Sequence, residues 1–138
     1  MGPAPHYRRM VGQDVSPYQL LGGADGVRTL VERFYQRMNR DPRFAALRKL
    51  HQQDLSETSE LLFRFLSGWF GGPNLYFQGP EHRCVMSAHR NLAIGAQEVG
   101  QWLACMNEAL RDANLGNDMT DRISTALSSF ANRMRNKN

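Results

Sequence analysis

Apolar side chains recur along most of this chain at intervals of three and four residues, the spacing that places them on one face of a helix. The clearest run begins after Asp25, which the pattern predicts as an N-cap. We therefore predict a long helix there with one buried face. Its apolar positions are Val27, Leu30, Val31, Phe34, Tyr35 and Met38.

Two more helices are predicted in the next part of the chain. Asp41 followed by Pro42 indicates the start of a short one, which we expect to end near His51. Residues 54–57 carry the cap and first-turn acidic signals of a longer one, and residues 71–73 (Gly-Gly-Pro) stop it. Residues 74–81 show no helical period, so we predict a loop, long enough for a compact domain to be a candidate functional segment. The apolar positions are Phe44, Leu47 and Leu50 in the short helix, and Leu61, Leu62, Phe65, Leu66, Trp69 and Phe70 in the longer one.

Three further helices complete the prediction. A short one spans residues 82–90, a long one follows a break near Ile94 and Gly95, and Asn117 with Asp118 caps the last. No segment alternates with a period of two, so we expect an all-α domain of about six helices and no strand. The apolar stripes are Trp102, Leu103, Met106 and Leu110 in the long helix, and Met119, Ile123, Ala126, Leu127, Phe130 and Met134 in the last one.

Composition narrows the class of protein without indicating a function. The 138 residues, 41% hydrophobic and 22% charged, are typical of one globular domain. No apolar run reaches the roughly 18 residues of a membrane span, and residues 1–9 lack the apolar stretch of a secretory signal, so we expect a cytoplasmic protein. Residues 1–17 have no apolar period and are predicted to form a flexible arm before a domain of residues 18–138.

Charge and cysteine content exclude several kinds of site. The formal net charge is +4, but the arginines are spread over every segment, mostly on polar helix faces, so we expect no nucleic-acid partner. The most different alternative is a basic helical module that binds nucleic acid, which steep salt dependence would reveal. Cys84 and Cys105 are too few for a disulfide framework or a four-cysteine zinc site, and we expect them to be buried.

His89 is the sharpest candidate for chemistry. It shares one face of its predicted helix with Val85 and Met86, so its imidazole would point into the interior and need a partner. That partner is either a backbone carbonyl, which makes His89 a core residue, or a metal ion. His82 lies about 10 Å away along the helix and cannot bind the same ion. A metal on His89 would take its other ligands from elsewhere, as a flat macrocycle provides.

Four other residues carry polar groups at positions of interest. Tyr35 and Trp102 lie on the apolar faces of long helices, and each has one polar hydrogen that needs an acceptor when buried. They are either core aromatics bonded to nearby carbonyls or donors to a ligand. His51 lies between a helix and a loop and would by default be exposed, and Tyr76 would hold its loop in place.

Taken together, these features resemble the group II truncated haemoglobins, bacterial and plant globins with a two-over-two helical sandwich. The resemblance covers roughly residues 18–110. Glu81, Arg83, Ala88 and Asn91-Leu92 depart from the family pattern around the proximal histidine. The matching motifs are Gly22-Gly23, the run Val31-Glu32-Arg33-Phe34-Tyr35, residues 65–73, the pair His82 and His89, and Trp102.

The resemblance implies a b-type haem whose iron is bound by His89. It implies hydrogen-bond donors for a bound gas at Tyr35, Trp102 and His51, while Thr58 would join them or border the entrance. Either His51 or Tyr35 would be a candidate internal sixth ligand when no gas is present. The wall of the site would be formed by Phe34, Leu62, Phe65, Tyr76, Val85, Met86 and Leu92.

The expected ligands are oxygen, carbon monoxide and nitric oxide. Two charge-assisted hydrogen bonds would slow oxygen release by roughly a hundredfold or more, which suits chemistry on the bound gas better than oxygen transport. Nitric oxide dioxygenation and peroxidase-like turnover are therefore the expected activities, with a reductase as a possible electron-donating partner of a monomer or homodimer. The alternative is a haem-based gas or redox sensor that acts through a separate protein.

Overall fold

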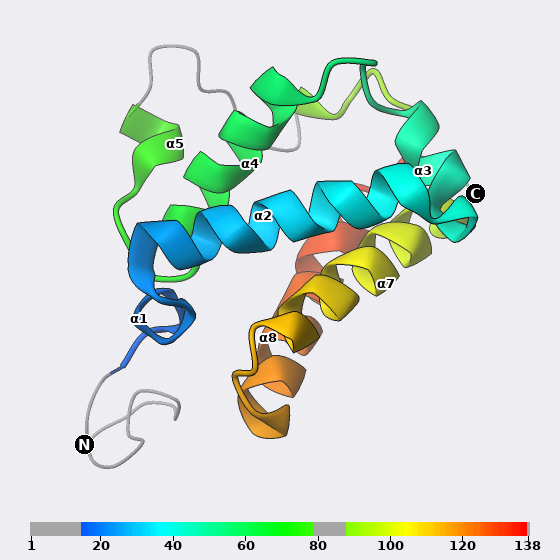
Figure 1. Ribbon diagram of the computed structural model, residues 1–138. Coiled ribbons are helices and arrows are strands. Elements are labelled where there is room, and N and C mark those ends of the chain that lie inside the picture. The colour runs from blue at the N-terminus through cyan, green and yellow to red at the C-terminus, as the bar shows by residue number, and fades with distance from the viewer. Residues whose placement is uncertain (1–14, 79–87, 138) are drawn as a thin grey trace.

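The computed structural model describes residues 15–78 and 88–137, and it has no strand in these two ranges. The all-α prediction is therefore confirmed for the described part of the chain. Of the helix predicted for residues 82–90, only residues 88–90 are described. The elements, shown in Figure 1, are α1 (Pro17–Leu21), α2 (Gly23–Arg40), the 3-10 helix η2 (Pro42–Phe44), α3 (Ala45–Lys49), α4 (Ser56–Trp69), α5 (Leu75–Gln78), α7 (Ala96–Asp112) and α8 (Asn117–Asn132).

Four long helices form two layers. Helix α2 packs against both α4 and α7, and α7 packs against α8, so α2 and α4 lie over α7 and α8 (Figure 1). Phe65 of α4 stacks on Phe130 of α8 with ring centroids 5.2 Å apart, which joins the outer pair across the layers. One apolar core fills the space between the layers. Its most deeply buried large side chains are Phe34, Phe44, Phe70, Met38, Leu66, Met106, Leu110 and Leu127.

Helix α2 buries the face that the sequence predicts. All six of its predicted apolar positions are buried, and no other residue of the helix is. The helix begins at Gly23 rather than after Asp25, because Gly22 adopts a left-handed conformation (φ 103°) that ends α1 and starts α2 in one turn. Asp25 is therefore not the N-cap. It lies in the first turn, where its negative charge interacts favourably with the positive end of the helix dipole and stabilises α2.

Four other local predictions differ from the structure, and one of them is Leu61, which lies on the predicted apolar face of α4 but is 42% exposed. Residues 75–78 form the short helix α5 instead of a loop, because four residues are too few to show a helical period. Helix α8 is preceded by Gly116 with no side-chain cap bond, so Asn117 is its first residue and not its cap. Ala126 faces solvent although it falls on the predicted stripe. Asp41, in contrast, is confirmed as a cap, since its side chain accepts a hydrogen bond from the Arg43 amide.

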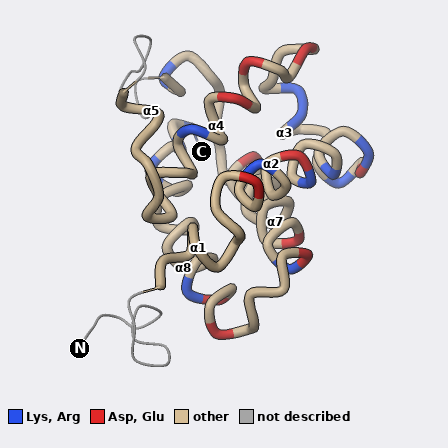
Figure 2. The backbone as a smooth tube through the Cα atoms, turned by 60° about the vertical axis from the view of Figure 1, so that its left-hand side comes forward, with Lys and Arg blue, Asp and Glu red and all other residues tan. Residues whose placement is uncertain are grey.

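The charged residues are spread over several elements, as predicted, and most of the arginines of α2 are paired. Figure 2 shows both signs of charge along α2 and α7, only basic residues in α3, and no charged residue in α1 and α5. Arg28 pairs with Glu60 of α4 at 3.0 Å. Arg37 pairs with Glu108 of α7 at 3.2 Å. These bridges are partly exposed, so each contributes little to stability. None of the helices in the described ranges is both long and apolar enough to cross a membrane.

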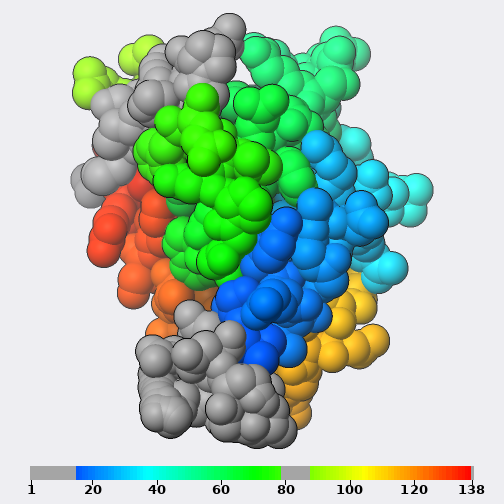
Figure 3. Space-filling model, turned by 90° about the vertical axis from the view of Figure 1, so that its left-hand side faces the viewer, coloured from blue at the N-terminus to red at the C-terminus, as the bar shows by residue number. Residues whose placement is uncertain are grey.

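The beginning of the described chain is packed against the end of α4. Ser16 and Gln19 form a capping box at α1, and Pro17 is buried. The Tyr18 amide donates to the Phe70 carbonyl at 3.0 Å. Figure 3 shows the atoms of α1 lying directly against those of α4 and α5 on this face. Residues 1–14 of the predicted arm lie outside the described part of the chain.

Two helical glycines give opposite predictions for stability. A methyl group on Gly26 would lie 1.7 Å from the Leu21 carbonyl oxygen, so the α1 backbone would have to move, whereas one on Gly100 would meet nothing within 4 Å. We expect Gly26→Ala to lower the free energy of unfolding by about 1–3 kcal/mol or more. Gly100→Ala, the matched control, should raise it by up to about 1 kcal/mol through helix propensity. Urea unfolding measures both, and equal changes in the two variants would contradict the packing seen at Gly26.

Candidate functional site

Side chains from three separate elements form a continuous row in the interior, which we call the aromatic row: Trp102, Phe34, Tyr35 and His51. Phe34 lies edge-on to Trp102 of α7, with ring centroids 5.6 Å apart, and edge-on to Tyr35 at 4.9 Å. Tyr35 in turn lies edge-on to His51 at 5.9 Å. The structure therefore brings together the three residues predicted as donors, although they are far apart in sequence.

Two polar hydrogens in the aromatic row are available to a ligand. Within the described ranges, neither the Tyr35 hydroxyl nor the Trp102 indole N–H has a hydrogen-bond partner. Tyr35 is only 7% exposed, and because its hydroxyl is not among the fully enclosed unpartnered atoms of the described residues, the oxygen remains accessible to a small molecule. Burial, and to a smaller extent Cys105, raises the pKa of Tyr35, so the hydroxyl keeps its proton and remains a donor.

His51 is half-buried, where the sequence alone would leave it exposed. Its Nδ1 lies 3.0 Å from the Leu47 carbonyl oxygen. Because a carbonyl only accepts, Nδ1 carries the proton, and neutral His51 presents Nε2 as an acceptor. Burial lowers the pKa of His51, the positive charges of Arg48 and His89 lower it further, and only the bond to Leu47 opposes them. His51 therefore donates through Nε2 only when it is protonated.

Residues 47–53, which we call the His51 corner, are held by hydrogen bonds from two sides. Arg48 donates to the carbonyls of Gln52 and Gln53, both at 2.9 Å, and its Nε donates to the Asn39 side chain of α2 at 2.7 Å. From α7, the Gln101 side chain accepts the Leu47 amide at 2.9 Å. Sequence reasoning missed both residues. A basic residue in the last turn of a helix is a known partner for free carbonyls and would have indicated Arg48, whereas no signal indicates Gln101.

Replacing Arg48 should loosen the His51 corner. In Arg48→Gln, the lost hydrogen bonds should lower the free energy of unfolding by about 1–2 kcal/mol. Removal of the positive charge should also raise the pKa of His51, since that charge lowers it. Arg48→Lys keeps the positive charge but loses the planar guanidinium group that donates several hydrogen bonds at once. It should therefore lower stability while leaving the His51 pKa low. NMR titration of the imidazole measures the pKa, and Arg40→Gln on α2 is the control that should change neither quantity.

His89 begins the connection to α7. It is half-buried, and its carbonyl accepts the Leu92 amide at 3.1 Å. Leu92 packs in a small apolar cluster with Ile94, and Trp102 contacts both this cluster and the main core. Trp102 thus links the segment that follows His89 to the aromatic row, through its contacts with this cluster and with Phe34.

The other predicted wall residues are only partly described. Phe34 is fully buried, while Leu62, Phe65 and Leu92 are half-buried apolar side chains, and Thr58 is half-buried as well. Tyr76 of α5 lies edge-on to Phe65 with ring centroids 5.8 Å apart. Half-buried apolar surface of this kind suits a large apolar ligand. His82, Cys84, Val85 and Met86 lie outside the described residues.

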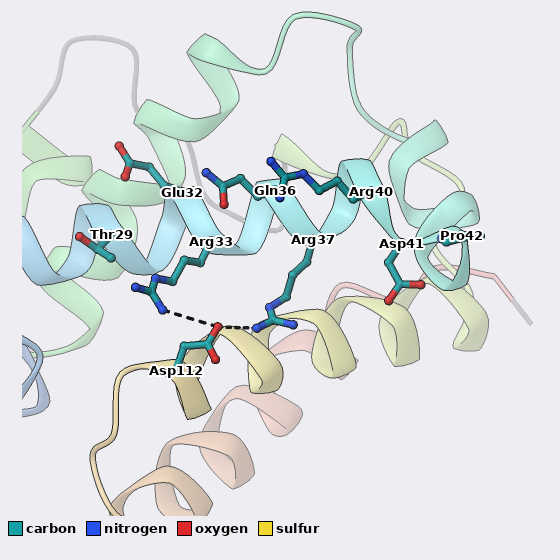
Figure 4. Close-up of a pocket in the computed structure, with 9 residues that line it drawn as sticks. All are labelled: Thr29, Glu32, Arg33, Gln36, Arg37, Arg40, Asp41, Pro42 and Asp112. Atoms are coloured by element: carbon teal, nitrogen blue, oxygen red, sulfur yellow. Dashed lines mark hydrogen bonds and ion pairs between the residues drawn. The ribbon is translucent and has the colours of Figure 1, made fainter.

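A concavity lies between α2 and α7, away from the aromatic row. It is an open groove of about 800 Å³ lined by charged residues, and it includes no member of the aromatic row. Figure 4 shows Arg33 and Arg37 of α2 reaching towards Asp112 of α7, with which both form ion pairs. Because the groove is open and two of its arginines pair with Asp112 across it, we interpret it as a solvent-exposed contact between the two helices.

Comparison with known proteins extends these observations to nearly the whole chain. Residues 16–136 match the family described as "Bacterial-like globin". The group 2 truncated hemoglobin YjbI of Bacillus subtilis is 28% identical over 122 residues, which are 88% of this chain and 89% of the relative.

Two solved structures share the fold over most of the chain. The group II 2-on-2 hemoglobin from the plant pathogen Agrobacterium tumefaciens has a TM-score of 0.85 and 29% identity, covering 94% of this chain and 100% of that one. The cold-adapted truncated hemoglobin from the Antarctic bacterium Pseudoalteromonas haloplanktis has a TM-score of 0.84 and 29% identity, covering 90% and 100%.

Proposed function

Because this chain belongs to the bacterial-like globin family, we propose that it is a haem b protein that binds diatomic gases at an iron held by His89. Its arrangement of α2 and α4 over α7 and α8 is the two-over-two fold of the group II truncated haemoglobins, as the sequence resemblance implied. The "oxygen-avid" haemoglobin of Bacillus subtilis, 28% identical with a TM-score of 0.77, supports the assignment of oxygen as one of the gases.

The residues of the pocket fit a haem. Leu62, Phe65 and Leu92 keep part of their apolar surface exposed, which a flat apolar macrocycle would cover. The observation that carries the proposal is the pair of polar hydrogens on buried Tyr35 and half-buried Trp102, which have no partner among the described residues. A polarised gas ligand bound beside the two rings would provide an acceptor for both.

Each member of the aromatic row has a distinct role in the proposed site. Bound haem supplies an iron that binds oxygen, carbon monoxide or nitric oxide. The Tyr35 hydroxyl and the Trp102 N–H would donate to the gas, and Phe34 would hold the angle of both rings through its edge contacts. His51, whose ring lies edge-on to Tyr35 and whose Nδ1 is held by the Leu47 carbonyl, would be a further polar group beside the Tyr35 ring.

The donors favour retention of oxygen over its release. Two hydrogen bonds to a ligand that carries negative charge contribute about 1.5–3 kcal/mol each, and together they slow escape by roughly a hundredfold or more. We therefore assign the protein to chemistry on the bound gas, such as nitric oxide or peroxide detoxification with electrons from a separate reductase.

Titration with haem tests the proposal. The wild-type protein should bind one equivalent, acquire an intense Soret band, and show a shift of that band when it is reduced and exposed to carbon monoxide. Failure to bind haem stoichiometrically would overturn the proposed function.

A further inference from the structure

The last described residues of the chain return to the segment that follows His89. The Asn136 side chain accepts the Ile94 amide at 2.9 Å through Oδ1 and donates to the Leu92 carbonyl at 2.7 Å through Nδ2. The Asn136 and Lys137 amides both donate to the Ile94 carbonyl, at 2.8 and 3.1 Å. Residues 136–137 are thus joined to residues 92–94 by both side-chain and backbone hydrogen bonds.

This contact is more specific than general packing of the residues after α8 would produce. Helix α8 ends at Asn132, and exposed residues beyond the last helix of a domain are usually poorly ordered. Here one amide group matches a backbone N–H and a backbone C=O that are two residues apart, so both halves of the side chain are used. Ile94 is itself buried against Val99 and Ala131, so the backbone groups that Asn136 contacts are held in place.

The same segment leads directly to His89. The Leu92 amide donates to the His89 carbonyl, and the Leu92 carbonyl accepts from Asn136. Leu92 therefore connects Asn136 to the backbone of His89. At the other end, the Gly95 amide donates to the Glu98 side chain at the start of α7. The connection between His89 and α7 is therefore held by α7 on one side and by the C-terminal residues on the other.

We infer that Asn136 is a positioning residue for His89, which fixes the backbone that carries the imidazole and thereby slows the loss of haem. The inference rests on the proposed function. Residues that orient a metal ligand from outside the coordination sphere typically change metal affinity about 10- to 100-fold when they are replaced. Asn136 acts through the backbone, so we expect an effect near the lower end of that range.

Two variants and a matched control test the inference in the haem-loaded protein. Asn136→Ala removes both side-chain bonds, whereas Asn136→Asp keeps an acceptor for the Ile94 amide and loses the donor to Leu92. In the control, Asn132→Ala, the lost side chain donates only to the Ser128 carbonyl within α8. The measurements are amide hydrogen exchange at Ile94, the rate of haem transfer to an excess of apomyoglobin, and the iron–histidine stretching band in the resonance Raman spectrum of the reduced protein.

The expected pattern separates the positioning role from a general loss of structure. In Asn136→Ala, the Ile94 amide hydrogen should exchange faster and haem should be lost about tenfold faster. The iron–histidine band should shift or broaden. Asn136→Asp should retain protection of Ile94 while still losing haem faster, and Asn132→Ala should behave as the wild type. If Asn136→Ala does not fold, Asn136→Asp carries the test.

Two results would count against different conclusions. Unchanged haem transfer and an unchanged iron–histidine band in the haem-loaded Asn136 variants would overturn the inference and leave a contact that only anchors the chain end. A wild-type protein that takes up no haem would overturn the proposed function, and the inference would fall with it.

Discussion

In His89→Gly, the Soret band of the haem-loaded protein should be lost or strongly altered, and its normal shift with carbon monoxide should disappear. The reason is that the proposed site draws its single protein-iron bond from this imidazole, and glycine offers no donor atom in its place. Glycine also leaves a space of the size of the lost ring. Free imidazole added to the variant should therefore enter that space and restore much of the wild-type spectrum.

A second histidine provides the control for this prediction. His51→Gly removes the imidazole at one end of the aromatic row, and it should leave the iron–histidine band of the reduced protein in place. Far-UV circular dichroism shows whether each variant is folded. An unaltered spectrum in folded His89→Gly would mean that another residue binds the iron, and it would remove the basis for assigning Asn136 as a positioning residue.

The fold was largely predictable because long helices with one buried face leave a clear period in the sequence. In α2 the six apolar positions match the six buried ones, since 18 residues allow the period to repeat several times. In α5 four residues allow no repeat, and the prediction of a loop was wrong. The order in which the helices pack came from the family resemblance and not from periodicity, because a stripe shows which face is buried but not what it packs against.

The sequence predicted the residues that meet in the aromatic row, but not the residues that hold the surrounding backbone. Tyr35, Trp102 and His51 were predicted as a group, and the structure places them in one row. Arg48 and Asn136 were missed because both act on backbone carbonyls and amides, whose positions depend on the folded chain. Long-range contacts of this kind leave no spacing pattern in the sequence.

Tyr35→Phe should release oxygen roughly 10- to 150-fold faster than the wild type, because one charge-assisted hydrogen bond of about 1.5–3 kcal/mol is lost. The change removes only the hydroxyl oxygen and keeps the ring that packs against Phe34 and His51. The hydroxyl has no other partner among the described residues, so the folded protein should lose little or no stability. Stopped-flow displacement of oxygen by carbon monoxide measures the rate.

Tyr18→Phe is the matched control, since it removes the same atom from α1, at the opposite end of α2 from His51, and it should leave the rate unchanged. Trp102→Phe should also speed release, but the double variant should fall short of the product of the two single effects. Both donors contact Phe34 and share one ligand, so removal of one allows the other to adjust. A Tyr35→Phe rate equal to that of the wild type would show that the free hydroxyl does not bind the gas.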